Sequence, residues 1–242
     1  MFTPNNNEYL KEYEKERIEV MEKVLLKLSD NFVLKGGTGL LFGYNLNRFS
    51  EDIDLDVINP KKNIKNEITN LKIEGYNLNI SIKKDTSTTF RVMIDYGGKR
   101  SDYPEGLNEY KLKLEVSLRT KGITEKDYRT VNGIKVYKIE SLIEQKILAF
   151  GARNKARDIY DMDFLLTKYS KHFSTTNYRN LIDIMERRDI DTISYELKLA
   201  LKEGMLSGIK KEIDPDLFAL KLDDKIQKGL EASLKLRKSL TR

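Results

Sequence analysis

One short segment, from Phe32 to Ile58, constrains the fold of this chain more than any other. It opens on the apolar run Phe32-Val33-Leu34, which predicts a buried strand. Gly36-Gly37 predicts a tight turn directly after that strand. Thr38 to Tyr44 then has a helical pattern, with Thr38 near the helix N-terminus. A strand that turns into a helix in this way offers free backbone N–H groups to an anion, so the segment predicts a phosphate-binding turn without the spacing of a P-loop.

The residues that follow alternate between acidic and apolar side chains, which is typical of a strand. Asp52, Asp54 and Asp56 share one face of it. Residues two apart lie about 6.6–6.8 Å apart along a strand, so Asp52 and Asp54 can converge on a pair of divalent ions. Hard oxygen ligands favour Mg²⁺ or Mn²⁺. Asp56 lies further along, and we interpret it as structural or solvated.

The composition restricts any chemistry to carboxylates, lysines and hydroxyls. The 242 residues include no cysteine, which excludes disulfides and thiolate metal sites. The single histidine leaves little room for a histidine-based triad or a zinc cluster. That histidine, His172, lies in a polar stretch and is expected at the surface. No apolar run is long enough to span a membrane, and the polar N-terminus has no signal-peptide pattern. We therefore expect a cytoplasmic protein with no membrane contact.

The order of elements predicts an α+β fold. A helical pattern runs from Glu8 to Leu28, and a second helix is expected between Asn63 and Gly75. After Lys138 only helical patterns remain, so we expect an α/β domain at 1–138, with its N-terminal helix, and a helical domain at 139–242. Alternating runs predict strands of a mixed sheet within 78–82, 89–96, 110–118 and 134–139, with turns at Gly97-Gly98, Pro104-Glu105-Gly106 and, in a tight hairpin, Asn132-Gly133.

The net charge of +6 is compatible with a polyanionic partner such as RNA. Lysines are frequent from Lys198 to Arg242, and a second basic cluster spans Lys146 to Arg157. The same charge is also reached by proteins with a merely solvated lysine surface.

Two sets of residues resemble a known family. Gly36-Gly37-Thr38 followed by Arg48 to Leu55 (RFSEDIDL) resembles the signature of the AbiEii/AbiGii toxins, a branch of the polymerase-β-like nucleotidyltransferases found in toxin–antitoxin loci. Lys146 in SLIEQKILAFGAR and the run KARDIYD at 155–161 match the second part of the pattern. The resemblance covers residues 33–166. It implies a polymerase-β-like nucleotidyltransferase domain whose active site is completed by the helical domain.

The resemblance also implies roles in the first half of the chain. Gly36, Gly37 and Thr38 would hold the nucleotide phosphates, and Asp52 and Asp54 would bind the metal ions. A third carboxylate is expected from a later neighbouring strand, where Glu115 is the first candidate and Asp95 the alternative. Arg48 and Ser50 would contact phosphate or brace the turn, and Lys35 would touch the nucleotide.

In the second half, the family elements fall on Lys146, Arg157, Asp158 and Asp161. Lys146 is expected at the border of a buried helix face, where it would reach the triphosphate or act as a snorkelling surface lysine. Arg157 and Asp161 would pair along the helix, or Asp161 would orient Lys146 or the nucleotide. The buried face of that helix is made by Ile139, Leu142, Ile143, Ile147 and Phe150.

These implications define a functional hypothesis. The chain would transfer NMP from an NTP to an acceptor, the 3′ end of tRNA, as the toxin of a system with a cognate antitoxin protein. One alternative is transfer to a protein or small-molecule hydroxyl. Another is an inactive nucleotide-binding module, against which the retention of both Asp52 and Asp54 argues.

Overall fold

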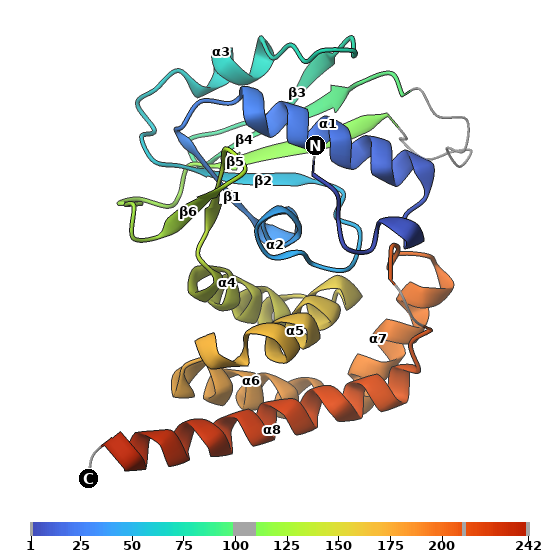
Figure 1. Ribbon diagram of the computed structural model, residues 1–242, viewed down its shortest axis with the longest axis vertical. Coiled ribbons are helices and arrows are strands. Elements are labelled where there is room, and N and C mark those ends of the chain that lie inside the picture. The colour runs from blue at the N-terminus through green and yellow to red at the C-terminus, as the bar shows by residue number, and fades with distance from the viewer. Residues whose placement is uncertain (1, 99–109, 210–211, 241–242) are drawn as a thin grey trace. The chain divides into compact units, whose positions relative to one another are not determined.

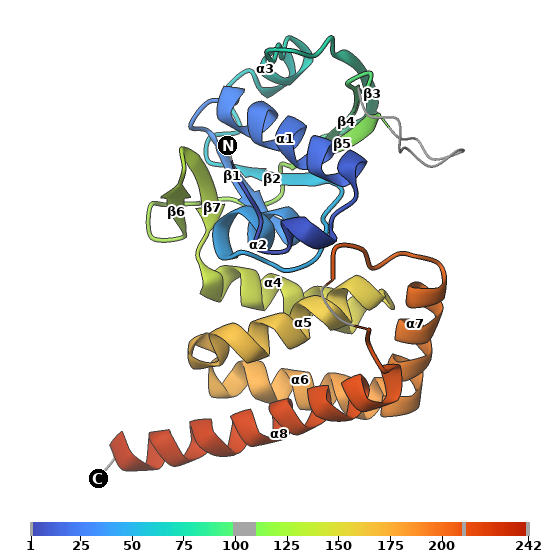
Figure 2. The same ribbon diagram turned by 45° about the vertical axis from the view of Figure 1, so that its right-hand side comes forward.

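The computed structural model describes residues 2–98, 110–209 and 212–240 of the chain. They fold into two compact units, Met1–Lys138 and Ile139–Arg242. The first unit is built on a mixed β-sheet and the second is helical, as Figures 1 and 2 show. The predicted α+β fold with a helical C-terminal part is therefore confirmed.

The described strands of the first unit form one sheet in the order β3-β4-β5-β2-β1-β7-β6. Strand β2 lies at its centre, antiparallel to β1 and parallel to β5. The elements are η1 (Asn7–Tyr9), α1 (Glu12–Lys27), β1 (Phe32–Lys35), α2 (Gly36–Tyr44), β2 (Ile53–Val57), α3 (Ile64–Thr69), β3 (Asn79–Asp85), β4 (Thr89–Asp95), β5 (Lys111–Ser117), β6 (Tyr128–Val131) and β7 (Ile134–Tyr137).

The two faces of this sheet differ in chemistry, because alternate residues of a strand point to opposite sides. One face is apolar and includes Ile53 and Leu55 of β2, both buried. Helix α1 crosses the sheet (Figure 1), and its Arg17 donates from Nε to the hydroxyl of Tyr96 at 3.3 Å. The other face carries Asp54 and its polar neighbours. The sheet thus presents the carboxylates away from its apolar side.

Most local predictions agree with the structure, and the differences have local causes. Asn132 and Gly133 have φ of 49° and 82° and join β6 to β7, as the hairpin prediction required. The helix expected from Asn63 to Gly75 ends at Thr69, since a turn follows and Gly75 has φ of 84°. Helix α2 begins at Gly36, two residues earlier than predicted. The turn predicted at 104–106 lies outside the described residues.

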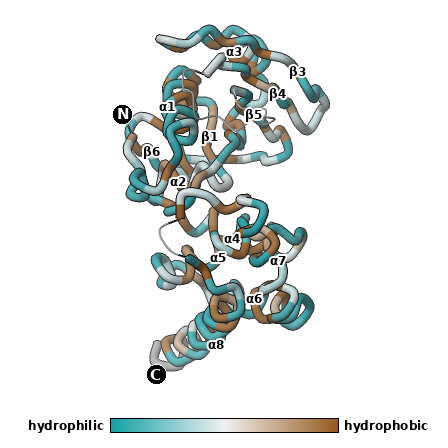
Figure 3. The backbone as a smooth tube through the Cα atoms, turned by 90° about the vertical axis from the view of Figure 1, so that its right-hand side faces the viewer, coloured by the Kyte–Doolittle hydropathy of each residue, from teal (hydrophilic) through white to brown (hydrophobic). Residues whose placement is uncertain are grey.

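The second unit consists of helices that pack through their apolar positions, which recur along each helix in Figure 3. Ser174 caps α6 by accepting a hydrogen bond at 3.1 Å from the backbone N–H of Asn177. Tyr160 stacks on Phe218, with ring centroids 6.2 Å apart. Within the described residues, no helix combines the length and apolar character needed to cross a bilayer. The elements are α4 (Ile139–Ala152), α5 (Ala156–Tyr169), η2 (Ser170–His172), α6 (Thr175–Arg188), α7 (Ile190–Lys202) and α8 (Pro215–Leu240).

Candidate active site

The two glycines after β1 lie where a side chain would not fit. Gly36 has φ of 68°, and a Cβ atom on it would be 3.0 Å from Oδ2 of Asp54. A Cβ atom on Gly37 would be 2.8 Å from Oγ of Ser50 and 2.9 Å from Nη2 of Arg48. At Gly37 these distances are shorter than the contacts that Cβ atoms make in proteins, so any side chain would force its neighbours to move. At Gly36 the positive φ itself favours glycine. The turn is therefore packed directly against the segment that bears the carboxylates.

Buried polar side chains connect this turn to the start of β2. Thr38 Oγ1 lies 2.9 Å from Ser50 Oγ and also donates to the backbone carbonyl of Asp52. Arg48 donates from Nη1 to the carbonyl of Phe49 at 2.6 Å. Thr38, Arg48 and Ser50 are all buried. The structure thus places Arg48 and Ser50 in bracing positions at the turn, one of the two roles expected for them.

Asp54 lies between two chemically different strands. In the sheet register it faces Lys35 on β1 and Glu115 on β5. Burial raises the pKa of Asp54, the carboxylates of Asp52 and Glu115 raise it further, and Lys113 and Lys35 act against this rise. A carboxylate with a raised pKa is one whose negative charge is poorly compensated in the fold. Asp52 and Glu115 are therefore near enough to Asp54 to disfavour its charge.

The sheet register separates the two candidates for a third carboxylate. Glu115 on β5 is the direct partner of Asp54 on the adjacent parallel strand. Asp95 lies on β4 and pairs with Lys111, four residues along β5 from Glu115, which is about 13 Å at the usual rise of a strand. The structure brings Glu115 beside Asp54 and leaves Asp95 apart from it.

Two of these carboxylates have basic partners. Lys113 Nζ lies 2.6 Å from Oδ2 of Asp52. Arg91 donates from Nε to Oε2 of Glu115 at 2.6 Å. Within the described part of the chain, no three acidic, histidine or cysteine side chains are grouped closely enough to hold a metal ion as they stand. A cation that bound here would have to compete with Lys113 for Asp52.

A buried ion pair lies next to the turn and has no clear signal in the sequence. Asp56 is 2% exposed, and it accepts hydrogen bonds from Lys35 Nζ at 2.6 Å and from the Tyr137 hydroxyl at 2.8 Å. Burial raises the pKa of Tyr137, and the charge of Asp56 raises it further. Asp56 therefore has the structural role and not the solvated one. It fixes the side chain of Lys35, the residue directly before Gly36.

In the second unit, Lys146 is 5% exposed, so it does not lie at the border of the helix face as expected, nor does it snorkel to the surface. Its Nζ lies 2.5 Å from Oδ2 of Asp161 and 3.3 Å from Oδ1 of Asp158, both buried. These two carboxylates of α5 compensate the charge of Lys146, which allows its burial. Of the roles expected for Asp161, the structure displays the pairing with Lys146.

Asp158 has a second basic partner. Arg153 donates to it from Nε at 2.7 Å and from Nη2 at 3.1 Å. Burial acts to raise the pKa of Asp158, but the hydrogen bonds from Arg153 and the charge of Lys146 outweigh it and leave the pKa lowered. Arg157, at the start of α5, is half-buried. The basic cluster predicted from Lys146 to Arg157 is thus partly neutralised within its own unit.

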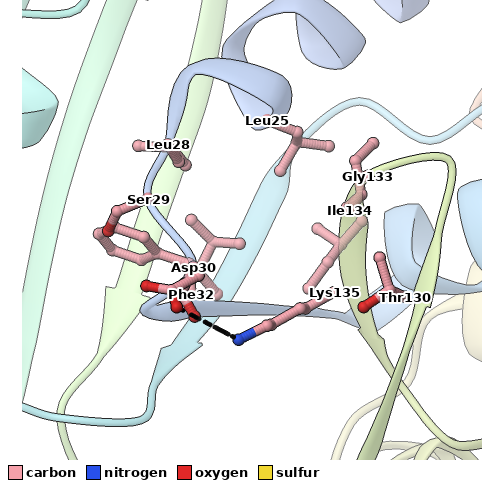
Figure 4. A pocket seen from close by; sticks show the side chains of 11 residues that line it. Leu25, Leu28, Ser29, Asp30, Phe32, Thr130, Gly133, Ile134 and Lys135 are labelled. Atoms are coloured by element: carbon pink, nitrogen blue, oxygen red, sulfur yellow. Dashed lines mark hydrogen bonds and ion pairs between the residues drawn. The ribbon is translucent and has the colours of Figure 1, made fainter.

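Two further features lie apart from these residues. A cavity of about 270 Å³ opens on the apolar side of the sheet, and its lining includes Leu34 and Leu55. Figure 4 shows Leu25, Phe32 and Ile134 among its other lining residues. Leu34 and Leu55 alternate with Lys35 and Asp54, so the cavity and the carboxylates are on opposite faces. His172 is exposed at the end of η2, 2.6 Å from Glu140, and its expected surface position is confirmed.

Comparison with known proteins identifies the family. Residues 19–231 match the family model described as nucleotidyl transferase AbiEii toxin, type IV toxin–antitoxin system. The chain belongs to the AbiEii family. As an AbiEii protein it is a nucleotidyltransferase and a toxin, which confirms the resemblance seen in its motifs. The family implies an NTP substrate and a cognate antitoxin.

Solved structures agree with this assignment. The AbiEii chain is similar to JHP933 from Helicobacter pylori, with 32% identity and a TM-score of 0.81 over 96% of this chain and 98% of that one. A second H. pylori structure, provisionally assigned as a nucleotidyltransferase, has 32% identity and a TM-score of 0.77 over 94% of this chain and 99% of that one. No curated protein matches the sequence.

Proposed function

We propose that this AbiEii protein transfers NMP from an NTP to the 3′ end of tRNA and depends on a divalent metal ion. The observation that carries the proposal is the position of Asp54. It lies on the same face as Asp52, opposite Glu115 in the register, and against the glycine turn at Gly36. Carboxylates beside a phosphate-binding turn are what a nucleotidyl transfer requires.

The chemistry of these side chains suits a divalent cation. Asp52 and Asp54 provide hard carboxylate oxygens. Burial raises the pKa of Asp54, and the charges of Asp52 and Glu115 raise it further, so a bound cation would compensate a carboxylate charge that the fold disfavours. Asp52 and Asp54 would hold Mg²⁺ or Mn²⁺, with Glu115 as the third carboxylate. Such an ion supplies charge stabilisation to the attacking hydroxyl and to the departing pyrophosphate.

The remaining parts of the turn bind and orient the nucleotide. The first backbone N–H groups of α2 have no partner within the helix and present positive charge at its N-terminus, where they would face the phosphates. Thr38 fixes the carbonyl of Asp52, so that the phosphate turn and the first carboxylate keep one relative position. Gly36 and Gly37 keep the backbone open to the ligand.

The family motif supports roles for residues of the second unit. We propose catalytic roles for Lys146 and Asp161 and nucleotide-binding roles for Arg157 and Asp158. Because Lys146, Asp158 and Asp161 are buried in ion pairs, a loss of activity on mutation has to be separated from a loss of stability.

The RNA acceptor is supported by charge. The protein has a net charge of +6, and phosphate contacts in RNA complexes come largely from lysine and arginine. Since Lys146 and Arg153 are engaged with Asp158, the Lys-rich segment from Lys198 to Arg242 is the better candidate for acceptor contacts.

The test is a transfer assay with each of the four α-labelled NTPs in turn, total RNA, and Mg²⁺ or Mn²⁺. We expect label in tRNA with at least one NTP, and a loss of at least about 100-fold in the Asp54→Asn variant. Label in a protein or a small molecule instead would establish one of the alternative acceptors. Absence of label with every acceptor, together with NTP binding by calorimetry, would establish an inactive nucleotide-binding module.

A further inference from the structure

Lys113 occupies a position in the sheet from which it reaches the carboxylate of Asp52. Ile53 pairs with Leu114 in the parallel register, so the residues before them, Asp52 and Lys113, are also neighbours. Glu115 lies two residues after Lys113 on β5, so the two side chains share one face of the sheet. The Lys113 Nζ is 2.6 Å from Oδ2 of Asp52, and the side chains of this pair are 31% and 27% exposed. The pair is therefore close enough to bind and open enough to separate.

We propose that Lys113 is an exchangeable counter-ion of the active site. It neutralises Asp52 when no divalent cation is bound, leaves Asp52 when Mg²⁺ or Mn²⁺ binds, and then contacts the triphosphate of the NTP. This inference rests on the proposed function, because it takes Asp52 and Asp54 as the metal ligands.

The chemistry of the pair supports an exchange. An ammonium group and a divalent cation compete for the same carboxylate oxygen and repel each other at short range. Lysine is suited to a change of partner, since its charge is carried at the end of a flexible four-carbon chain with three rotatable donors. Asp54 and Glu115 would themselves hold the cation in the proposed site, and Glu115 also accepts from Arg91. The triphosphate of the substrate is therefore the anion that would take up the released ammonium.

A second lysine on the same face shows the contrast. Lys35 also lies near Asp54 in the register, but its Nζ is bound to Asp56, which is 2% exposed and receives a further hydrogen bond from Tyr137. A buried and doubly bonded partner holds its cation firmly. Lys35 is thus a fixed charge, whereas the half-exposed Lys113–Asp52 pair is the exchangeable one.

The test measures Mn²⁺ affinity of the full chain without nucleotide, by electron paramagnetic resonance or calorimetry. We expect Lys113→Met to bind Mn²⁺ about threefold to tenfold more tightly than wild type, because a competing cation is removed. Lys111→Met is the matched control: it removes the same charge from the same strand and face, but opposite Asp95. Its Mn²⁺ affinity should stay within about twofold of wild type.

The second measurement is the affinity for a non-hydrolysable NTP analogue at saturating Mg²⁺. We expect Lys113→Met to bind the analogue about threefold to tenfold more weakly, as expected for one lost contact to phosphate. Opposite changes in metal and nucleotide affinity distinguish an exchange from simple damage to the fold, which would weaken both.

Each other outcome has a definite meaning. Unchanged or weaker Mn²⁺ binding by Lys113→Met would overturn the inference while leaving the proposed function intact, provided that Asp54→Asn loses Mn²⁺. Tighter Mn²⁺ binding with unchanged nucleotide affinity would overturn the transfer of Lys113 to the triphosphate. Equal Mn²⁺ binding by wild type and Asp54→Asn would overturn the proposed metal site, and the inference with it.

Discussion

Gly36 and Asp54 are packed so closely that a methyl group added to Gly36 would press against the Asp54 carboxylate. A Cβ atom on Gly36 would be 3.0 Å from Oδ2 of the Asp54 carboxylate. The glycine that shapes the turn after β1 thus lies against the carboxylate of β2. The two strands are antiparallel, and Asp54 pairs with Lys35, the neighbour of Gly36. The conformation of the turn and the position of the carboxylate are fixed together.

Replacing Gly36 with alanine should impair both stability and transfer. A non-glycine residue at φ of 68° costs about 1–2 kcal/mol, and its Cβ would push on the Asp54 carboxylate. We expect a lower free energy of unfolding in urea and a loss of nucleotide transfer of at least about tenfold.

Gly122→Ala provides the control for this change. Gly122 has a similar φ of 72°, but a Cβ atom there would meet no atom within 4 Å. The Gly122→Ala variant should lose about as much free energy of unfolding as Gly36→Ala and keep the transfer rate of the wild type. Equal transfer rates in the two variants would show that the contact with Asp54 has no part in the reaction.

Replacing Asp54 with asparagine should stabilise the metal-free protein near pH 7. The pKa of Asp54 is raised in the fold, so folding opposes ionisation of this group, and its charge lowers stability as pH rises through the folded pKa. Asparagine carries no charge to bury. We expect a higher melting temperature for Asp54→Asn at pH 7 in the presence of a chelator.

The pH dependence checks this explanation. At a pH low enough to protonate Asp54 in both the folded and the unfolded chain, the carboxyl is neutral and the advantage of asparagine should disappear. An advantage that is the same at pH 3.5 and at pH 7 would exclude the ionisation of Asp54 as its cause.

Glu115→Gln and Asp95→Asn should affect transfer differently. Glu115 faces Asp54 in the register, whereas Asp95 pairs with Lys111 further along the sheet. We expect the Glu115 variant to lose at least about tenfold of the metal-supported transfer rate and the Asp95 variant to keep it. Steady-state transfer at several Mg²⁺ concentrations measures this, and a greater loss in the Asp95 variant would reverse the assignment of the third carboxylate.

The sequence predicts local features of this fold better than contacts across it. The strand, glycine turn, helix and second strand follow from patterns within about one turn or pleat, which short-range physics determines. The choice between Glu115 and Asp95 depends on strand register, which no local pattern encodes. The burial of Lys146 likewise depends on Asp158 and Asp161, which compensate its charge only once α4 and α5 have packed.

Tyr137→Phe should weaken the protein in a pH-dependent manner. It removes the hydroxyl that donates to Asp56 at 2.8 Å, which costs about 1–3 kcal/mol for a buried bond to a charged group. The pKa of Tyr137 is raised above its usual value near 10, so the tyrosine contributes stability that is present below about pH 10 and is lost as pH rises further. Urea unfolding of both proteins from pH 8 to 11 should give stabilities that converge. Parallel curves would contradict this.

Lys146→Met should strongly destabilise the second unit, and Asp161→Asn should partly rescue it. Loss of Lys146 leaves the Asp161 carboxylate, 0% exposed, without its ammonium partner at 2.5 Å, which costs about 3–5 kcal/mol. In the double variant this buried charge is also removed, so its stability should exceed that of Lys146→Met. Urea unfolding of four proteins, the wild type, Lys146→Met, Asp161→Asn and the double variant, gives the coupling energy of the pair.

The same four proteins separate a structural role from a catalytic one. If Lys146 and Asp161 only held the helices together, transfer would recover in the double variant along with its stability. We expect stability to recover and transfer to remain lost, because the proposed roles in the reaction require the ammonium and carboxylate groups themselves. Transfer should be measured at a temperature where the double variant is fully folded, and a rate within about twofold of wild type would remove both residues from the catalytic group.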